Sequence, residues 1–68
     1  MKISARNTLK GKIVEIVKGA TTSHVRIDIG GAVVTASITN EAVAELNLET
    51  GKQAYAVIKA SDVMVGID

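Results

Sequence analysis

Two short polar segments, one near each end of the chain, carry residue types suited to binding a small anion. The first is Ser4-Ala5-Arg6-Asn7 and the second is Ile58-Lys59-Ala60-Ser61-Asp62-Val63-Met64. Each places a cation beside a short hydroxyl side chain, and charge-assisted hydrogen bonds from such cations are strong. The alanines leave the main chain accessible, so that successive backbone N–H groups can form an anion-binding concavity. If folding joins the two segments, within one chain or between chains, they form a pocket for a tetrahedral oxyanion.

A third candidate element, Thr39-Asn40, stands at the expected start of a helix. Free backbone N–H groups at such a position also favour anions. Taken singly, Arg6 and Lys59 fit solvated surface cations better than ligands, and Ser4 and Ser61 fit ordinary turn residues. The same residue types at both ends of one chain favour the binding interpretation.

The remaining polar residues offer little for catalysis or metal binding. His24 is the single histidine and lies on the polar side of its expected strand beside Arg26 and Asp28, as is typical of an exposed residue. With no cysteine, one histidine cannot form a zinc site unless several carboxylates surround it. The scattered glycines match neither the dinucleotide nor the P-loop spacing, and no nucleophile–base pair is evident. We therefore expect no metal ligation, no covalent cofactor and no enzymatic activity.

The length and composition predict one small domain, residues 1–68, that needs additional stabilisation. A chain of 68 residues buries only about 60% of its unfolded surface. Domains of this size usually depend on disulfides, a metal or subunit contacts. Because cysteine is absent and 47% of the residues are hydrophobic, we expect oligomerisation to supply the missing stability.

Charge and hydropathy argue against several classes of partner. The formal net charge of +1 provides no strong field for nucleic acids or anionic membranes. No apolar run is long enough to span a bilayer. The first residues, Met1-Lys2-Ile3-Ser4, contain no signal-peptide core. We expect a cytoplasmic protein.

Apolar residues recur mostly at every second position, which predicts strands. The expected strands are residues 9–18, 23–29, 33–38, 53–58 and 62–67. Gly30-Gly31 predicts a two-residue hairpin turn, because glycine tolerates the positive φ that such turns require. Residues 41–46 form the expected helix, which Asn47 ends in a left-handed conformation. This order predicts an all-β fold with one short helix, a small five-stranded OB-like Greek-key barrel.

The longest expected strand, residues 9–18, is apolar on both sides. Strict alternation places Leu9, Ile13 and Val17 on one side and Val14 and Ile16 on the other. An antiparallel sheet in a monomer normally leaves one face in water. We therefore expect the chain's own core to cover one face and a neighbouring chain to cover the other.

The motifs at the two ends resemble those of a known family. Three segments are similar to the molbindins, the small molybdenum–pterin-binding or Mop proteins: Ser4-Ala5-Arg6-Asn7-x-Leu9-x-Gly11, Ile38-Thr39 before a short helix, and AVIKASDVM over residues 56–64. The similarity covers nearly the whole chain. Related modules occur in a bacterial molybdate-responsive transcription regulator and at the end of molybdate-transporter ATPases.

The resemblance implies a homohexamer, a trimer of dimers, that binds molybdate and usually tungstate between subunits. It also implies which residues surround the oxyanion, with Ala60 contributing backbone and Thr39 taking part in some members. The predicted oxyanion site therefore comprises Ser4, Ala5, Arg6, Asn7, Thr39, Lys59, Ala60 and Ser61. A second kind of site at subunit interfaces is implied without assigned residues.

These inferences predict a cytoplasmic protein that stores or buffers molybdate and tungstate, with a stand-alone regulatory or delivery module as the alternative. A nucleic-acid-binding OB module is less favoured, because such modules stack bases on aromatic side chains in a basic groove. Tyr55 is the only aromatic residue here. An enzyme acting on a pterin, which the older family name suggests, would lack a recognisable set of catalytic residues.

Overall fold

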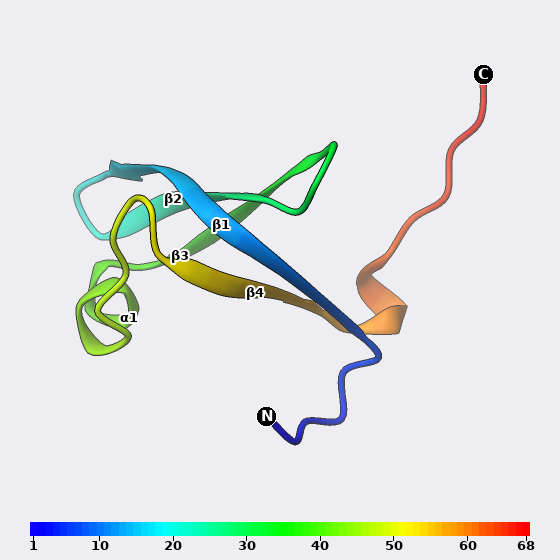
Figure 1. The fold of residues 1–68 in the computed structure, drawn as a ribbon, viewed down its shortest axis with the longest axis horizontal. Coiled ribbons are helices and arrows are strands. Elements are labelled where there is room, and N and C mark those ends of the chain that lie inside the picture. The colour runs from blue at the N-terminus through cyan, green and yellow to red at the C-terminus, as the bar shows by residue number, and fades with distance from the viewer.

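A long, bent strand at the centre of an antiparallel sheet organises the fold (Figure 1). In the computed structural model, which describes residues 1–68, this strand is β1 (Asn7–Lys18). Its C-terminal part pairs with β2 (Thr22–Asp28), and its N-terminal part pairs with β4 (Gln53–Ile58). β3 (Val33–Thr39) pairs with β2, which gives the order β3-β2-β1-β4. The sheet curls into an open half-barrel.

The β2–β3 hairpin and the helix follow the sequence prediction. The Ile29 N–H donates to the Ala32 carbonyl at 2.9 Å, and both Gly30 and Gly31 between them have positive φ. This confirms the predicted two-residue turn. The helix α1 (Asn40–Glu45) begins and ends one residue earlier than predicted.

Local side-chain chemistry sets the two ends of α1. Its N-cap is Thr39, whose Oγ1 accepts a hydrogen bond from the Ala42 N–H at 3.0 Å. Asn47 follows the helix at a φ of 52°, which confirms the predicted left-handed position. The structure contains no helix with the length and hydropathy needed to cross a membrane.

The core lies on the concave face of the curled sheet. It consists of four buried residues, Ile13, Val25, Ile27 and Ala56. The remaining half-buried apolar side chains packed against them are Leu9, Ile16, Ile29, Val34, Ile38, Val43, Leu48 and Ala54. The alternation predicted for β2 and β3 is confirmed, since every second residue of each strand turns toward this core.

The predicted alternation along β1 is wrong in its second half. A β-bulge interrupts the pairing with β2, because Ile13 pairs with Ile27 while Glu15 already pairs with Arg26. One extra residue in β1 reverses which side chains face the core beyond that point. Ile16 therefore packs against the core, whereas Val17 is exposed.

The predicted fifth strand is also absent, so the sheet has four strands. After β4 the chain forms the short 3₁₀ helix η1 (Ala60–Asp62) and then runs out as residues 63–68, here called the C-terminal arm (Figure 1). Met64, Val65 and Ile67 are each more than 90% exposed. The alternating apolar pattern of residues 62–67 predicted a strand, and this prediction is wrong for the single chain, because no neighbouring strand pairs with these residues.

Without a fifth strand, the barrel stays open between β3 and β4. An apolar trough of about 710 Å³ lies along this opening, which we call the seam. Its lining is mostly hydrophobic and includes Val34 and Ile38 from β3 and Ala54 and Ile58 from β4. β3 and β4 are both edge strands, so each also leaves backbone N–H and C=O groups without a ladder partner.

Candidate anion-binding site

Pairing of β1 with β4 brings the two predicted motifs to one corner of the fold. Asn7, the first residue of β1, pairs with Ile58, the last residue of β4. The next residues outward along the two strands are Arg6 and Lys59. Two residues 53 positions apart in the sequence, each with a permanent positive charge, thus leave the sheet at the same end.

Beyond this pair the two segments run apart (Figure 1). Ser4, Arg6, Lys59 and Ser61 are all exposed, and none of their side chains makes a hydrogen bond or ion pair within the chain. Neither of the two main cavities is lined by any of them. A single chain therefore presents the predicted ligands at one corner without enclosing an anion.

The backbone of η1 is arranged to leave donors free. The Asp62 N–H donates to the Lys59 carbonyl at 2.9 Å, and the Val63 N–H donates to the Ala60 carbonyl at 3.3 Å. These bonds do not use the N–H groups of Ala60 and Ser61, as expected for the first residues of a helical turn. Two backbone donors accordingly accompany Lys59, in the segment where the sequence predicts backbone contacts.

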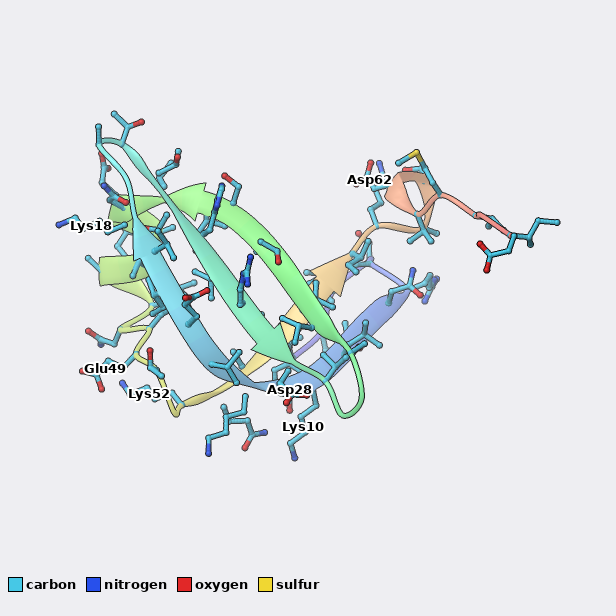
Figure 2. The ribbon with its side chains drawn as sticks, turned by 90° about the horizontal axis from the view of Figure 1, so that it is seen from above. Lys10, Lys18, Asp28, Glu49, Lys52 and Asp62 are labelled. Atoms are coloured by element: carbon cyan, nitrogen blue, oxygen red, sulfur yellow. The ribbon has the colours of Figure 1, made fainter.

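The carboxylate closest in sequence to Lys59 makes no ion pair with it. Asp62 is exposed on η1, apart from the charged side chains of the sheet (Figure 2). The two ion pairs of the molecule lie elsewhere: Arg26 with Glu15 at 3.4 Å, and Lys52 with Glu49 at 3.8 Å. Arg6 and Lys59 therefore keep their charges uncompensated by the chain itself.

Thr39 lies at the opposite end of the sheet from the other predicted ligands. It pairs with Thr22, beyond the C-terminal end of β1, whereas the terminal motifs lie at Asn7. The 12 residues of β1 separate the two positions along the sheet. One chain thus does not bring Thr39 to Arg6 or Lys59, and only a second copy can place it beside them.

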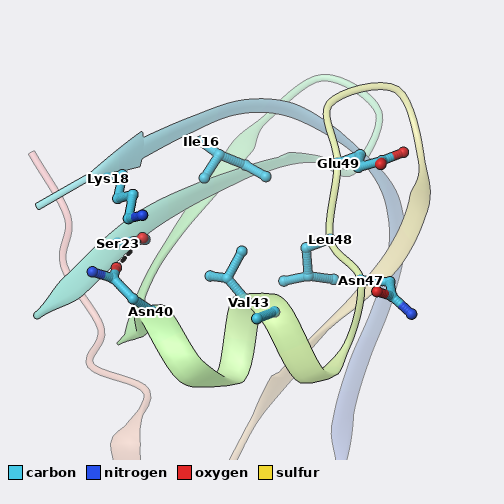
Figure 3. A pocket seen from close by; sticks show the side chains of 9 residues that line it. Ile16, Lys18, Ser23, Asn40, Val43, Asn47, Leu48 and Glu49 are labelled. Carbon is cyan, nitrogen blue, oxygen red and sulfur yellow. Dashed lines mark hydrogen bonds between the residues drawn. The ribbon is translucent and has the colours of Figure 1, made fainter.

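A hydrogen-bonded network beside α1 is the polar feature that sequence reasoning missed (Figure 3). Ser23 is the only buried polar residue, at 2% exposure, and its Oγ lies 2.5 Å from Asn40 Oδ1. The Asn40 Nδ2 donates to the Gly19 carbonyl at 3.0 Å and lies 3.4 Å from that of Ala20. The sequence analysis placed Asn40 at the helix start, as a candidate for the helix cap and for anion binding. An amide that accepts and donates at once can serve this second role, but the pattern contains no signal that Ser23 is its partner.

The cavity next to this network is a poor anion site. Its volume is about 270 Å³, and it is lined by polar and apolar residues that include Lys18 and Glu49 (Figure 3). The Glu49 carboxylate would repel an anion. The buried hydroxyl of Ser23 is already bonded, and no buried side-chain polar atom of the molecule lacks a partner. The polar groups here serve the fold.

His24 and the acidic residues form no metal site. His24 is exposed on β2, opposite Val17 and Ser37, as the sequence predicts. No group of three or more His, Cys, Asp or Glu side chains comes together anywhere in the chain.

Comparison with known proteins agrees with the fold and the motifs. The family model of the TOBE domain matches residues 3–65. A probable molybdenum-pterin-binding protein of Haemophilus influenzae is 58% identical over 69 residues, with all of both chains covered. A molybdate-binding protein from Sporomusa ovata has a TM-score of 0.93 at 39% identity and covers 98% of this chain and 100% of its own.

A second similar structure is the cytoplasmic molybdate-binding protein ModG, solved with molybdate bound. Its TM-score is 0.93 at 43% identity, and the match covers 100% of this chain and 49% of ModG. The fold of this chain is thus similar to that of solved molybdate-binding proteins. The chain belongs to the TOBE-domain family and, within it, to the molybdenum-pterin-binding (Mop) proteins.

Proposed function

We propose that this protein binds molybdate, and tungstate as its close analogue, at the interfaces of a homo-oligomer. The observation that carries the proposal is the corner where Asn7 pairs with Ile58 and where Arg6 and Lys59 leave the sheet together. Two unpaired cations, two short hydroxyl groups and two free backbone donors suit a tetrahedral dianion. Relatives that share the whole chain are named for binding molybdenum compounds.

The interface part of the proposal follows from the open arrangement of these groups. Exposed, diverging ligands do not enclose an ion, and water competes effectively for each of them. A second copy placed against the corner would bury the cations and supply donors from the remaining directions. It could also bring its Thr39, which one chain holds at the far end of β1.

The C-terminal arm and the seam indicate how copies would join. The arm exposes Val63, Met64, Val65 and Ile67, and the seam offers an apolar trough between two unpaired strand edges. A partner's arm lying in the seam would supply the fifth strand, cover apolar surface and close the barrel. The arm begins two residues after Ser61, so that its insertion would carry Lys59 and Ser61 to the subunit boundary. The Mop resemblance extends this contact to a hexamer of three dimers.

Storage or buffering in the cytoplasm is the role that fits such an assembly. The site holds an ion by charge and hydrogen bonds, and the relatives' names describe binding without catalysis. A ligand bound between subunits stabilises the assembly by mass action. Uptake and release of the ion would thereby be coupled to the stability of the oligomer.

Native mass spectrometry with and without molybdate tests the proposal in one measurement. We expect an oligomer whose mass increases by several molybdate ions, with tungstate giving the same number. Sulfate, which is a smaller tetrahedral dianion, is the matched control and should bind far more weakly. A strictly monomeric protein, or an oligomer without retained molybdate at millimolar ligand, would contradict the proposal.

A further inference from the structure

We propose that Asn7 is a positioning residue, which holds Lys59 in place for the anion through the backbone of Ile58. The inference rests on the proposed molybdate function and assigns Asn7 a role other than direct contact. The Asn7 Nδ2 donates to the Ile58 carbonyl at 3.2 Å, across 51 positions of sequence. It is the only side-chain hydrogen bond that links the two terminal motifs.

The accepting carbonyl makes this bond relevant to Lys59. The carbonyl of Ile58 and the N–H of Lys59 belong to the same peptide group, which is planar and rigid. A bond to that oxygen therefore restrains the direction in which the chain continues into Lys59. The other strand residues near the corner contribute only backbone pairing, and the last pair of a ladder opens more readily than its interior.

The burial of Asn7 supports the same role. Asn7 is half-buried on the concave side of β1, whereas the neighbouring Arg6 and Thr8 are exposed. A side chain that contacts an anion at this exposed corner would be expected on the exposed side of the strand. One of the two N–H donors of the Asn7 amide is engaged with protein, and the side chain lies on the opposite face of the strand from its exposed neighbours, so we assign the anion contact to Arg6, Lys59 and the serines.

A double-mutant cycle distinguishes positioning from direct contact. Asn7→Leu removes the donor at similar size and should weaken molybdate binding about three- to tenfold, the effect of one lost hydrogen bond. In a Lys59→Ala background, which retains Arg6, the same substitution should change affinity by less than about twofold. Thr8→Val, on the exposed side of the adjacent position, is the matched control and should leave affinity unchanged. Isothermal titration calorimetry provides all the constants.

Each other outcome would overturn the inference. An equal loss of molybdate affinity in both backgrounds would mean that Asn7 contacts the anion or acts independently of Lys59. No loss of affinity when Asn7 alone is replaced would mean that Asn7 has no role in binding. If the unmodified chain fails to bind molybdate, the proposed function itself is wrong. Normal binding with an unaffected Asn7 variant contradicts the positioning role alone. Asn7→Ala repeats the cycle if the leucine disturbs folding.

The unmodified chain offers an independent measurement. Proton exchange of the Asn7 side-chain amide, followed by NMR, should already be slowed without molybdate and should remain so when the ion is added. Protection that arises only with molybdate would indicate direct contact and would contradict positioning.

Discussion

The two ends of β1 differ in how completely the chain satisfies its own polar and apolar groups. At the helix end, where Lys18 precedes the turn into β2, the buried Ser23 donates to the half-buried Asn40, and Asn40 donates to a turn carbonyl. At the terminal end, beyond Asn7 and Ile58, Arg6 and Lys59 have no partner, and an apolar arm extends into solvent.

This difference separates what stabilises a single chain from what requires another molecule. A buried hydroxyl is tolerated at the helix end because its hydrogen bonds are made internally. An exposed apolar segment is unfavourable for a solitary monomer, since contiguous apolar surface favours association. The polar network at the helix end is therefore satisfied within one copy, whereas in the proposed function the terminal end would gain its partners from an anion and a second copy.

Removing the C-terminal arm should produce the largest effect. A chain ending at Asp62 loses the segment proposed to fill a partner's seam, so we expect monomers and, with them, loss of molybdate binding. Native mass spectrometry and circular dichroism together separate dissociation from unfolding. Val65→Asp, which places a charge on the arm, should act in the same direction, whereas Met64→Leu should leave the oligomer intact. If the truncated chain still forms the original oligomer, the terminal end does not depend on the arm for its contact with a second copy.

Replacing both terminal cations should abolish binding without unfolding the chain. Arg6→Ala combined with Lys59→Ala removes two charge-assisted interactions, and we expect affinity for molybdate to fall more than about 100-fold. Both side chains are exposed, so the melting temperature without ligand should change little. Lys10→Ala with Lys12→Ala removes the same charge from the outer face of β1 and is the control for calorimetry. Unchanged affinity in the first double variant would show that other groups bind the ion.

Asn40→Ala should have its main effect on stability, which tests the helix end. The substitution leaves the Ser23 hydroxyl without its side-chain partner and frees the turn carbonyls, at a cost of about 1–3 kcal/mol in unfolding free energy. Urea denaturation monitored by circular dichroism measures the change. Glu41→Ala, at the adjacent exposed position of α1, should cost less than about 0.5 kcal/mol. Equal losses for the two variants would mean that the network does not stabilise the helix end.

The smallest effect is expected at a cation remote from both ends. Arg26 forms an ion pair with Glu15, and their side chains are 54% and 51% exposed, so Arg26→Gln should alter stability by less than about 0.5 kcal/mol. Molybdate affinity should stay within about twofold of that of the unmodified chain. Salt screens the interaction between an exposed charge on the sheet and an anion at the terminal end. A large loss of affinity would place the anion on the sheet and away from the terminal end.

Local patterns predicted much of the fold and the composition of the candidate site. The alternation of β2 and β3, the glycine turn and the left-handed Asn47 depend on side-chain period and backbone conformation within a few residues. The two terminal motifs were recognisable because the residue types suited to an oxyanion occur in both. Pairing of Asn7 with Ile58 then placed those motifs at one corner, as the hypothesis required.

The sequence by itself thus determined the alternating strands, the turns and the chemical types of the site residues, since each depends on neighbours along the chain. Tertiary structure alone decided three further features: the bulge after Ile13, the bond between Ser23 and Asn40, and the detachment of the C-terminal arm. Each depends on which distant segment lies opposite. None of the three leaves a periodic signal in the sequence. The bulge is a one-residue shift in pairing, the bond depends on the distance between two polar side chains, and the arm is detached because no strand lies beside it.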